Sequence, residues 1–339
     1  MKAGFSRASL LSVGILTAAF VSTGRAAQNP GSGAPVAAAD HTTRLILLGT
    51  AAGPIPRALR SQPANVLIVD GRPYLIDAGD GVARQLVMAG FEPADVRHIF
   101  ITHHHIDHNA DLGALISFDW IEDYQRNAAS APPVQIYGPP STTFLVQAAL
   151  DYLSVSERIF SAGMPIFAAK SRFQAHDIDH DGVVYTDDRV RVTAAENTHF
   201  HQPSSSPTYG KDRSYSYRFD TPGRSVVFTG DTGPSEAVTK LAEGADVLVT
   251  EIEDIETMMK ITTGKLTKPQ ADAFREHLEQ EHLTPEAVGK MAAAAHVKSV
   301  VLTHFTPDED APTDASSFTK GIRKYYNGPV MAGRDLFEY

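Results

Sequence analysis

Four imidazoles and the carboxylate of Asp107 gather in residues 101–112, which read ITHHHIDHNADL. The apolar run of residues 96–102 precedes them and predicts a buried strand that ends at Thr102. Neutral imidazole and carboxylate are ligands that suit Zn²⁺, and after it Mn²⁺ or Fe²⁺. The alternative is a solvated, histidine-rich loop, but such a loop does not need a hydrophobic strand leading into it. The motif therefore predicts a metal site.

Three later apolar segments also predict strands, and each comes shortly before a residue that metals bind. The segments are residues 189–198, 225–228 and 299–303, and the residues that follow them are His199, Asp231 and His304. Open sheets present their sites at the carboxyl ends of strands. We therefore expect these three side chains to meet the histidine cluster in the folded protein.

The order of these motifs resembles that of the metallo-β-lactamase-fold hydrolase superfamily. The motifs are His-x-His-x-Asp-His, a single His, Thr-Gly-Asp and Leu-Thr-His, flanked by LLGT at residues 47–50 and LIDAG at residues 75–79. The segment GDTGP followed by ADVLVTE at residues 245–251 is closer to the ribonuclease Z, phosphodiesterase and arylsulfatase-like branch. The resemblance covers residues 43 to 338, and it implies an α/β (α+β) fold, the four-layer αββα sandwich. Alternating strands and helices in two halves favour the same architecture.

The resemblance also implies a site for two divalent metal ions, with Zn²⁺ expected first and Mn²⁺ or Fe²⁺ as alternatives. It assigns His103, His105 and His199 to the first ion, Asp107, His108 and His304 to the second, and Asp231 to both. Two such ions would hold a shared solvent molecule as hydroxide for attack on an ester. Asp231 has a plainer interpretation as a turn residue, but with the other ligands present we favour the bridging role.

His282 is the predicted proton donor. Thr284 is a suitable N-cap and Pro285 a suitable first residue for a helix, so His282 should lie beside a helix start. Sequences of the ribonuclease Z and phosphodiesterase-like branch have a His at this point, which implies a general acid. A surface histidine is the alternative, and His277 and His201 are weaker candidates for the same role. The predicted catalytic residues are Asp107, Asp231 and His282.

Several other polar residues are expected to support the site or to lie outside it. Asp77 is expected either to position the histidine loop from a neighbouring strand end or to orient a ligand imidazole. Glu251 is another candidate to orient a ligand, whereas His104 should point away from the metals. Residues 176–181 contain a second group of His and Asp, which we interpret as a solvated loop. Residues 201–213 follow a ligand directly, so Tyr209 and Lys211 either contact the substrate or belong to a surface loop.

The composition and the N-terminus restrict the compartment and the partners. Residues 1–27 predict a signal peptide, 28–42 a flexible linker, and 43–339 one hydrolase domain. The apolar core of the signal is too short for a stable membrane anchor. The 339-residue chain has no Cys and a formal charge of −10, which is unfavourable for nucleic-acid binding. We expect an exported, periplasmic protein that acts on a small molecule, with a homodimer possible.

The predicted function is metal-dependent hydrolysis of a small ester, with a phosphodiester or sulfate ester favoured. Opening of a cyclic ester or amide, as in a lactonase or β-lactamase, is the first alternative, although β-lactamases lack the bridging Asp. Processing of tRNA 3′ ends is less favoured, because the sequence shows no basic, Gly-rich arm that would clamp tRNA. A non-catalytic metal-binding protein is least favoured, because all seven ligands are present.

The periodicity of the chain predicts the remaining elements. Predicted strands are residues 44–48, 65–70, 73–77, 134–137, 183–186, 189–195, 214–219 and 224–229. Predicted helices are residues 80–90, 111–125, 141–153, 234–243, 268–280, 285–296 and 315–326.

Overall fold

The computed structural model describes residues 42–201, 204–207, 209–307 and 315–339. The predicted signal peptide and all but the last residue of the predicted linker lie outside these ranges. Residues 41–339 form one compact unit by their contacts. Within the described ranges, the structure contains no helix that is both long and apolar enough to cross a membrane.

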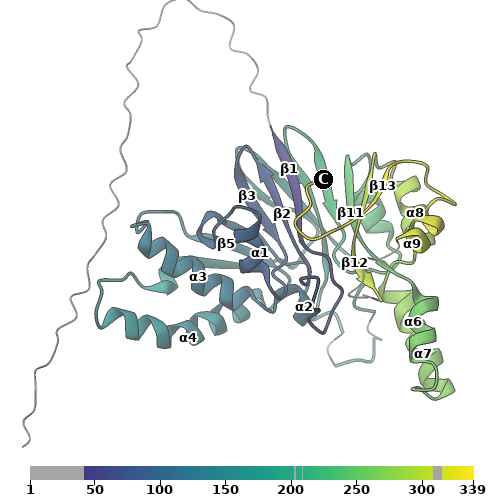
Figure 1. Ribbon diagram of the computed structural model, residues 1–339, viewed down its shortest axis with the longest axis horizontal. Coiled ribbons are helices and arrows are strands. Elements are labelled where there is room, and N and C mark those ends of the chain that lie inside the picture. The colour runs from purple at the N-terminus through teal and green to yellow at the C-terminus, as the bar shows by residue number, and fades with distance from the viewer. Residues whose placement is uncertain (1–41, 202–203, 208, 308–314) are drawn as a thin grey trace, which may run out of the picture. The chain divides into compact units, whose positions relative to one another are not determined.

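Two sheets form the centre of this unit (Figure 1). The first sheet keeps its six strands in chain order: β1 Thr43–Gly49, β2 Ala64–Val69, β3 Arg72–Ile76, β4 His98–Phe100, β5 Val134–Gly138 and β6 Phe173–Asp177. The second sheet has seven strands, running from β13 at one edge to β7 at the other: β7 Gly182–Thr186, β8 Arg191–Glu196, β9 Tyr215–Asp220, β10 Ser225–Phe228, β11 Val247–Glu253, β12 Val300–Thr306 and β13 Val330–Ala332.

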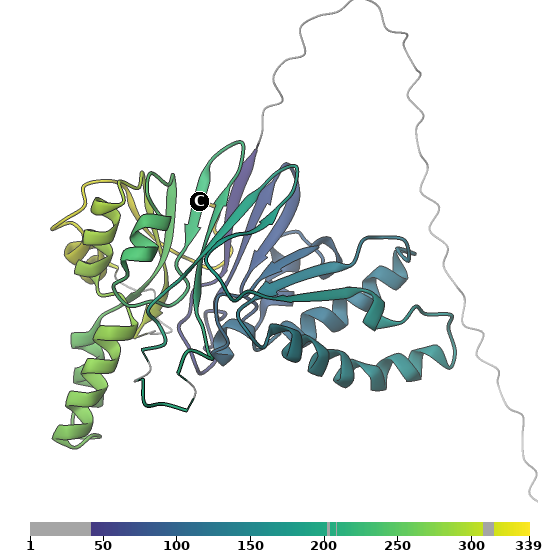
Figure 2. The same ribbon diagram turned by 180° about the vertical axis from the view of Figure 1, so that it is seen from behind.

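Most of the helices cover the outer face of one sheet or the other. Those after β3, β4 and β5 are α1 Val82–Met88, α2 Ile106–Asn109, α3 Leu112–Gln125 and α4 Thr142–Ser161. Those of the second half are α5 Glu236–Leu241, α6 Ile255–Thr262, α7 Lys268–Glu281, α8 Pro285–Ala294 and α9 Ser316–Ile322. Two views show α6 and α7 as a hairpin that stands clear of both sheets (Figures 1 and 2).

Three apolar clusters define four layers. One joins the first sheet to α1, α3 and α4, another joins the second sheet to α5, α8 and α9, and the third lies between the sheets. β1 shows how the sequence produces this arrangement: Leu45 and Leu47 face the other sheet, whereas Ile46 and Leu48 face the helices. A strand buried on both faces must be apolar at successive positions. The predicted αββα sandwich is confirmed.

The strand directions place one end of each sheet where the ligand-type residues lie. β3, β4, β5 and β6 are parallel neighbours, and so are β10, β11, β12 and β13. The carboxyl ends of parallel neighbours lie at a common edge, so the residues that follow β4, β10 and β11 are brought together there.

The structure also differs from the predicted elements. The strand expected to reach Thr102 ends at Phe100, because the Thr102 N–H donates to Asp77 Oδ1 (2.8 Å) instead of to a neighbouring strand. α4 continues to Ser161, eight residues beyond its predicted end. The sequence prediction missed α6 and β13 entirely, and it missed β6, which contains His176 and Asp177 of the segment interpreted as a loop.

Candidate metal centre

The short helix α2 gives the histidine motif its geometry. His105 is the N-cap of α2 with an extended backbone, so Asp107 and His108 follow on the first helical turn. His103, Asp107 and His108 are all buried. A change from extended to helical backbone within six residues thus lets one motif supply two clusters of ligands.

Three histidines form the first group of ligands. The ligand atoms of His103, His105 and His199 lie within 4.8 Å of one another. His199 Nδ1 lies 3.1 Å from the carbonyl oxygen of Glu281, which only accepts hydrogen bonds. Nδ1 therefore carries the proton, and Nε2 is left to bind a metal. Burial first, then the neighbouring His282 and His105, lower the pKa of His199 to about 3, which keeps the imidazole neutral as a ligand requires.

Asp107, His108, Asp231 and His304 form the second group, and their ligand atoms also lie within 4.8 Å of one another. His108 Nε2 is 3.4 Å from Asp107 Oδ2, and His304 Nε2 is 3.3 Å from the same oxygen. All four residues are buried. Two carboxylates and two imidazoles are a donor set that suits Zn²⁺ or another divalent transition metal.

Asp231 connects the two groups. Its carboxylate lies 3.3 Å from His108 Nε2 and 3.2 Å from His304 Nε2 in the second group. It also lies 3.9 Å from His103 Nε2 and 4.0 Å from His199 Nε2 in the first. Burial opposes ionisation, but His304 and His108 hold the pKa of Asp231 well below its usual range. An ionised carboxylate within reach of both groups is suited to binding two metal ions at once.

Unpartnered atoms at this point fit bound metal ions. His103 Nε2, His108 Nε2, His304 Nδ1 and Asp231 Oδ1 are buried and have no hydrogen-bond partner. Leaving a buried polar atom unpaired costs about 1–3 kcal/mol. Coordination of a metal gives His103, His108 and Asp231 the partner that the protein itself does not supply. The residues present therefore fit the predicted cofactor.

Asp77 holds the second group in place. Its carboxylate lies 2.9 Å from His108 Nδ1 and accepts hydrogen bonds from the N–H and hydroxyl of Thr102. Since a carboxylate only accepts, the proton of His108 sits on Nδ1 and Nε2 faces the metal position. Asp77 has a positive φ of 63°, which fixes the turn that follows β3. These contacts with Thr102 and His108 agree with both roles expected of Asp77, positioning the histidine loop and orienting a ligand.

His282 lies beside the two groups, held by buried carboxylates. Its Nδ1 is 2.7 Å from Glu251 Oε2 and 3.9 Å from Glu253 Oε2. Burial alone would lower the pKa of His282, but Glu251 and Asp231 raise it to about 10. His282 also belongs to a group of metal-ligand atoms with His199 and Asp231, so the imidazole lies next to the metal positions. Thr284 is the N-cap of α8 and Pro285 its first residue, as predicted.

The other sequence candidates lie outside the two ligand groups. His104 lies 3.3 Å from the carbonyl oxygen of Pro139, and it points away from the metals as expected. His277 is half exposed and pairs with Glu281, and His201 and Tyr209 are exposed. His176 lies 2.8 Å from Gln135 Oε1 on the neighbouring strand. In the part of the chain that is described, no group of metal-ligand atoms includes residues of 176–181.

A cavity of about 420 Å³ opens at the metal groups. His105, Asp107, Asp231, His282 and His304 line one part of it. Glu253 at the end of β11 and the apolar side chains of Met258, Phe274 and Leu278 line another part. Sequence reasoning missed these four residues. The alternation Glu251-x-Glu253 in an otherwise apolar strand was the available signal, because alternate residues share one face.

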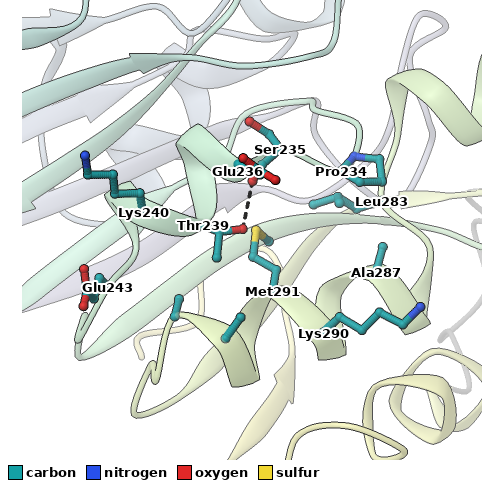
Figure 3. A pocket seen from close by; sticks show the side chains of 12 residues that line it. Pro234, Ser235, Glu236, Thr239, Lys240, Glu243, Leu283, Ala287, Lys290 and Met291 are labelled. Carbon is teal, nitrogen blue, oxygen red and sulfur yellow. Dashed lines mark hydrogen bonds between the residues drawn. The ribbon is translucent and has the colours of Figure 1, made fainter.

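A second hollow, of about 800 Å³, lies between α5 and α8 (Figure 3). Its labelled side chains include Glu236, Lys240 and Met291, and the Thr239 hydroxyl donates to the Ser235 carbonyl within it. It contains none of the metal-ligand groups found among the described residues. The metal-ligand groups of the described residues therefore lie at the other cavity.

The chain also matches a known protein family in sequence. Residues 72–305 match the family described as the Beta-lactamase superfamily domain. The match spans more than half of the chain, and the chain therefore belongs to this superfamily of metal-dependent hydrolases.

Similar proteins within this class include several ribonucleases Z. The ribonuclease Z of Mycobacterium sp. (strain KMS) is 32% identical over 290 residues, which are 86% of this chain and 93% of the relative. That of Mycobacterium avium (strain 104) is 31% identical over 294 residues, 86% and 95% of the two chains.

Solved structures share the fold at lower identity. The metallo-beta-lactamase fold protein YhfI from Bacillus subtilis has a TM-score of 0.60 at 18% identity, covering 88% of this chain and 98% of its own. Human tRNase Z, short form, has a TM-score of 0.57 at 22% identity, covering 87% and 98%. These likenesses establish the fold alone.

Proposed function

We propose that the protein hydrolyses small phosphodiesters, or sulfate esters, at a centre of two divalent metal ions, with Zn²⁺ the expected metal. The observation that carries the proposal is the position of Asp231, whose carboxylate lies within 4.0 Å of imidazoles in both ligand groups. When bound, two metal ions supply an activated water and polarise the oxygen of the ester. True β-lactamases lack this bridging carboxylate, which is why phosphodiester chemistry is favoured over the opening of a β-lactam.

Residues of the chain itself supply the rest of the chemistry. Asp77 holds the Nδ1 proton of His108 and the Glu281 carbonyl holds that of His199, so Nε2 of each imidazole is left for a metal ion. His282 donates a proton to the leaving oxygen, because Glu251 holds its Nδ1 and leaves Nε2 on the opposite side of the ring. Glu251 also accepts a hydrogen bond of 2.6 Å from the Thr232 N–H, so the position of this carboxylate is itself fixed.

A second candidate function is processing of tRNA 3′ ends. It is favoured by the relatives named ribonuclease Z, which match 86% of the chain. The same type of bond is cleaved in both cases, so the metal groups do not discriminate between them. The described residues that line the cavity include no Lys or Arg, and a polyanionic substrate usually needs such side chains. The small phosphodiester remains our first candidate for this reason.

One panel of assays tests the proposal. The metal content of the purified protein is measured together with turnover of bis(p-nitrophenyl) phosphate, p-nitrophenyl sulfate, an acyl-homoserine lactone, nitrocefin and a tRNA precursor. Asp231→Asn is the test variant, and Asp188→Asn, on the surface, is its matched control. We expect phosphodiester or sulfate turnover that Asp231→Asn abolishes. Turnover of only the lactone or nitrocefin, or of only the tRNA precursor, would refute the proposal.

We also propose that the protein is exported to the periplasm after loss of residues 1–27. Two basic residues and the short apolar segment of residues 10–21 in the N-terminal sequence support this. The mass of the protein recovered from the periplasmic fraction tests it. A full-length protein found only in the cytoplasm would contradict export.

A further inference from the structure

The cavity at the metal groups has two chemically different sides. Metal-ligand side chains and His282 contribute the polar part of its lining, and Met258, Phe274 and Leu278, from α6 and α7, contribute an apolar part that we call the apolar side. Its volume of about 420 Å³ falls within the range of small-molecule sites, which are mostly apolar with a few placed polar groups. Nothing in the metal chemistry explains the apolar side, because ester hydrolysis at the metals does not require it.

The hairpin of α6 and α7 builds the apolar side. α6 begins directly after β11, where the Asp254 side chain caps it by accepting from the Thr257 N–H (3.0 Å). α7 begins at a capping box formed by Thr267 and Gln270. Both helices are thus started by local caps, each of which is worth roughly 1 kcal/mol. The first residue of each helix is therefore defined, and this helps to position the side chains that line the cavity.

One face of α7 carries two of the apolar side chains together with the proton donor. Phe274 and Leu278 are four residues apart, and His282, the C-cap of α7, is four residues further on. Side chains four residues apart lie above one another on the same face of a helix. Phe274, Leu278 and His282 therefore form a row, in which the apolar side chains come next to the imidazole that we propose as the proton donor.

The charge of the cavity agrees with an apolar occupant. Asp107, Asp231 and Glu253 contribute carboxyl groups, and no Lys or Arg lines the cavity among the residues described. Burial is the main cause that raises the pKa of Glu253, to about 7. Two metal ions would offset the charge of the ligands, but the apolar side chains of Met258, Phe274 and Leu278 do not attract a further anion. We call these three side chains the apolar wall.

We propose that the leaving group of the substrate is an apolar alcohol or phenol, bound against Met258, Phe274 and Leu278. The inference rests on the proposed hydrolysis of a small ester. In the reaction, water adds its oxygen to phosphorus and the bond from phosphorus to the leaving oxygen breaks. The electron pair of that bond goes to the leaving oxygen, which takes a proton from His282. The proton released by water restores the imidazolium.

The test compares variants of the wall with a control on the same hairpin. Phe274→Ala and Met258→Ala remove half-buried side chains that line the cavity, whereas Ile261→Ala removes an apolar side chain of α6 that is 43% exposed and does not line it. The substrates are bis(p-nitrophenyl) phosphate and methyl p-nitrophenyl phosphate, whose leaving group is the same aryl group. We expect kcat/KM to fall roughly tenfold or more for both substrates in Phe274→Ala, less in Met258→Ala, and not in Ile261→Ala.

A loss for the bis-aryl substrate alone would place the wall at the non-leaving group and overturn the inference. Equal values for wild type and both wall variants would also overturn it. Binding of diphenyl phosphate and dimethyl phosphate to the zinc-loaded proteins, measured by calorimetry, separates this inference from the proposed reaction. One outcome is that the wild type hydrolyses no phosphodiester and still binds diphenyl phosphate more tightly than dimethyl phosphate, with this preference lost in Phe274→Ala. That result would refute the reaction and support the apolar wall. Equal affinities for both phosphates in all four proteins would refute the wall.

Discussion

Replacing Asp77 with Asn should weaken binding of the second metal ion far more than binding of the first. The carboxylate of Asp77 accepts from the Thr102 N–H at 2.8 Å and lies 2.9 Å from His108 Nδ1, which must donate to it. In Asp77→Asn one oxygen still accepts from Thr102. An amide NH₂ then faces the Nδ1–H of His108, and two donors oppose each other. His108 must lose this bond or move its proton to Nε2, the nitrogen left for the metal.

The expected size follows from this lost contact. A hydrogen bond to a charged group contributes about 1.5–3 kcal/mol, which corresponds to a change of about 10- to 150-fold in a dissociation constant. The histidines of the first group do not bond to Asp77. His103 is linked to it only through the Thr102 hydroxyl, 3.1 Å from His103 Nδ1. The first metal should therefore bind with nearly unchanged affinity.

Competition with a chromophoric chelator measures both affinities on the metal-free protein. Asp188→Asn serves as the control, because Asp188 is an exposed acid that pairs with Arg72 at the surface. Urea unfolding of the metal-free variants shows whether the fold is intact. A second-metal affinity within twofold of wild type would refute the proposed orienting role. Equal weakening of both metals would show that Asp77 acts through the fold rather than through His108.

Three further predictions use other contacts. Asp231→Asn should lose tight binding of both metals, because the carboxylate reaches both groups, and metal analysis after dialysis checks this; retention of two ions per chain would contradict it. His282→Ala should lower kcat about 10²- to 10⁴-fold with metal content unchanged, and less for substrates with acidic leaving groups, which need no proton; an equal loss for all leaving groups would argue against proton donation. Asp119→Asn tests linkage: burial first, then Asp123, raises the pKa of Asp119 to about 8 against the opposing effect of Arg97. The folded wild type therefore holds a proton that the unfolded chain releases above its pKa near 3.9, so stability from this group is complete below about pH 4 and declines as the pH rises to about 8. Urea unfolding at pH 5 and pH 8 should show that Asp119→Asn removes this part of the decline, and identical slopes in both proteins would contradict the pKa shift.

The pattern of strands, helices and ligand-type residues along the chain predicts the fold class, and the structure confirms it. Ligand-type residues near the ends of apolar strands indicate the site, because strand ends in such sheets meet at one edge regardless of the intervening loops. His304 differs from the prediction in lying within β12 instead of after it. His199, Asp231 and His304 come from distant parts of the chain, and the fold brings them to the histidine motif as the pattern indicated. The sequence also predicts the N-cap at Thr284 correctly, because a cap depends on a few adjacent residues.

The tertiary structure alone decided the contacts that no local pattern encodes. The strand before the motif ends early because Asp77, 25 residues away, captures the Thr102 N–H. β6 forms because its backbone pairs with β5, and this pairing overrides the polar composition around His176. β13, a short strand, likewise depends on pairing with β12.

The cavity shows the same division between sequence and structure. The sequence supplied the ligands, which are recognisable by residue type, but Met258 and Phe274 are ordinary apolar residues in their own helices. Only the position of the α6–α7 hairpin beside the metal groups makes them a wall of the cavity. Ligand chemistry is carried by the identity of single residues, whereas the shape of a pocket depends on how separate elements pack, and that is settled only in the folded chain.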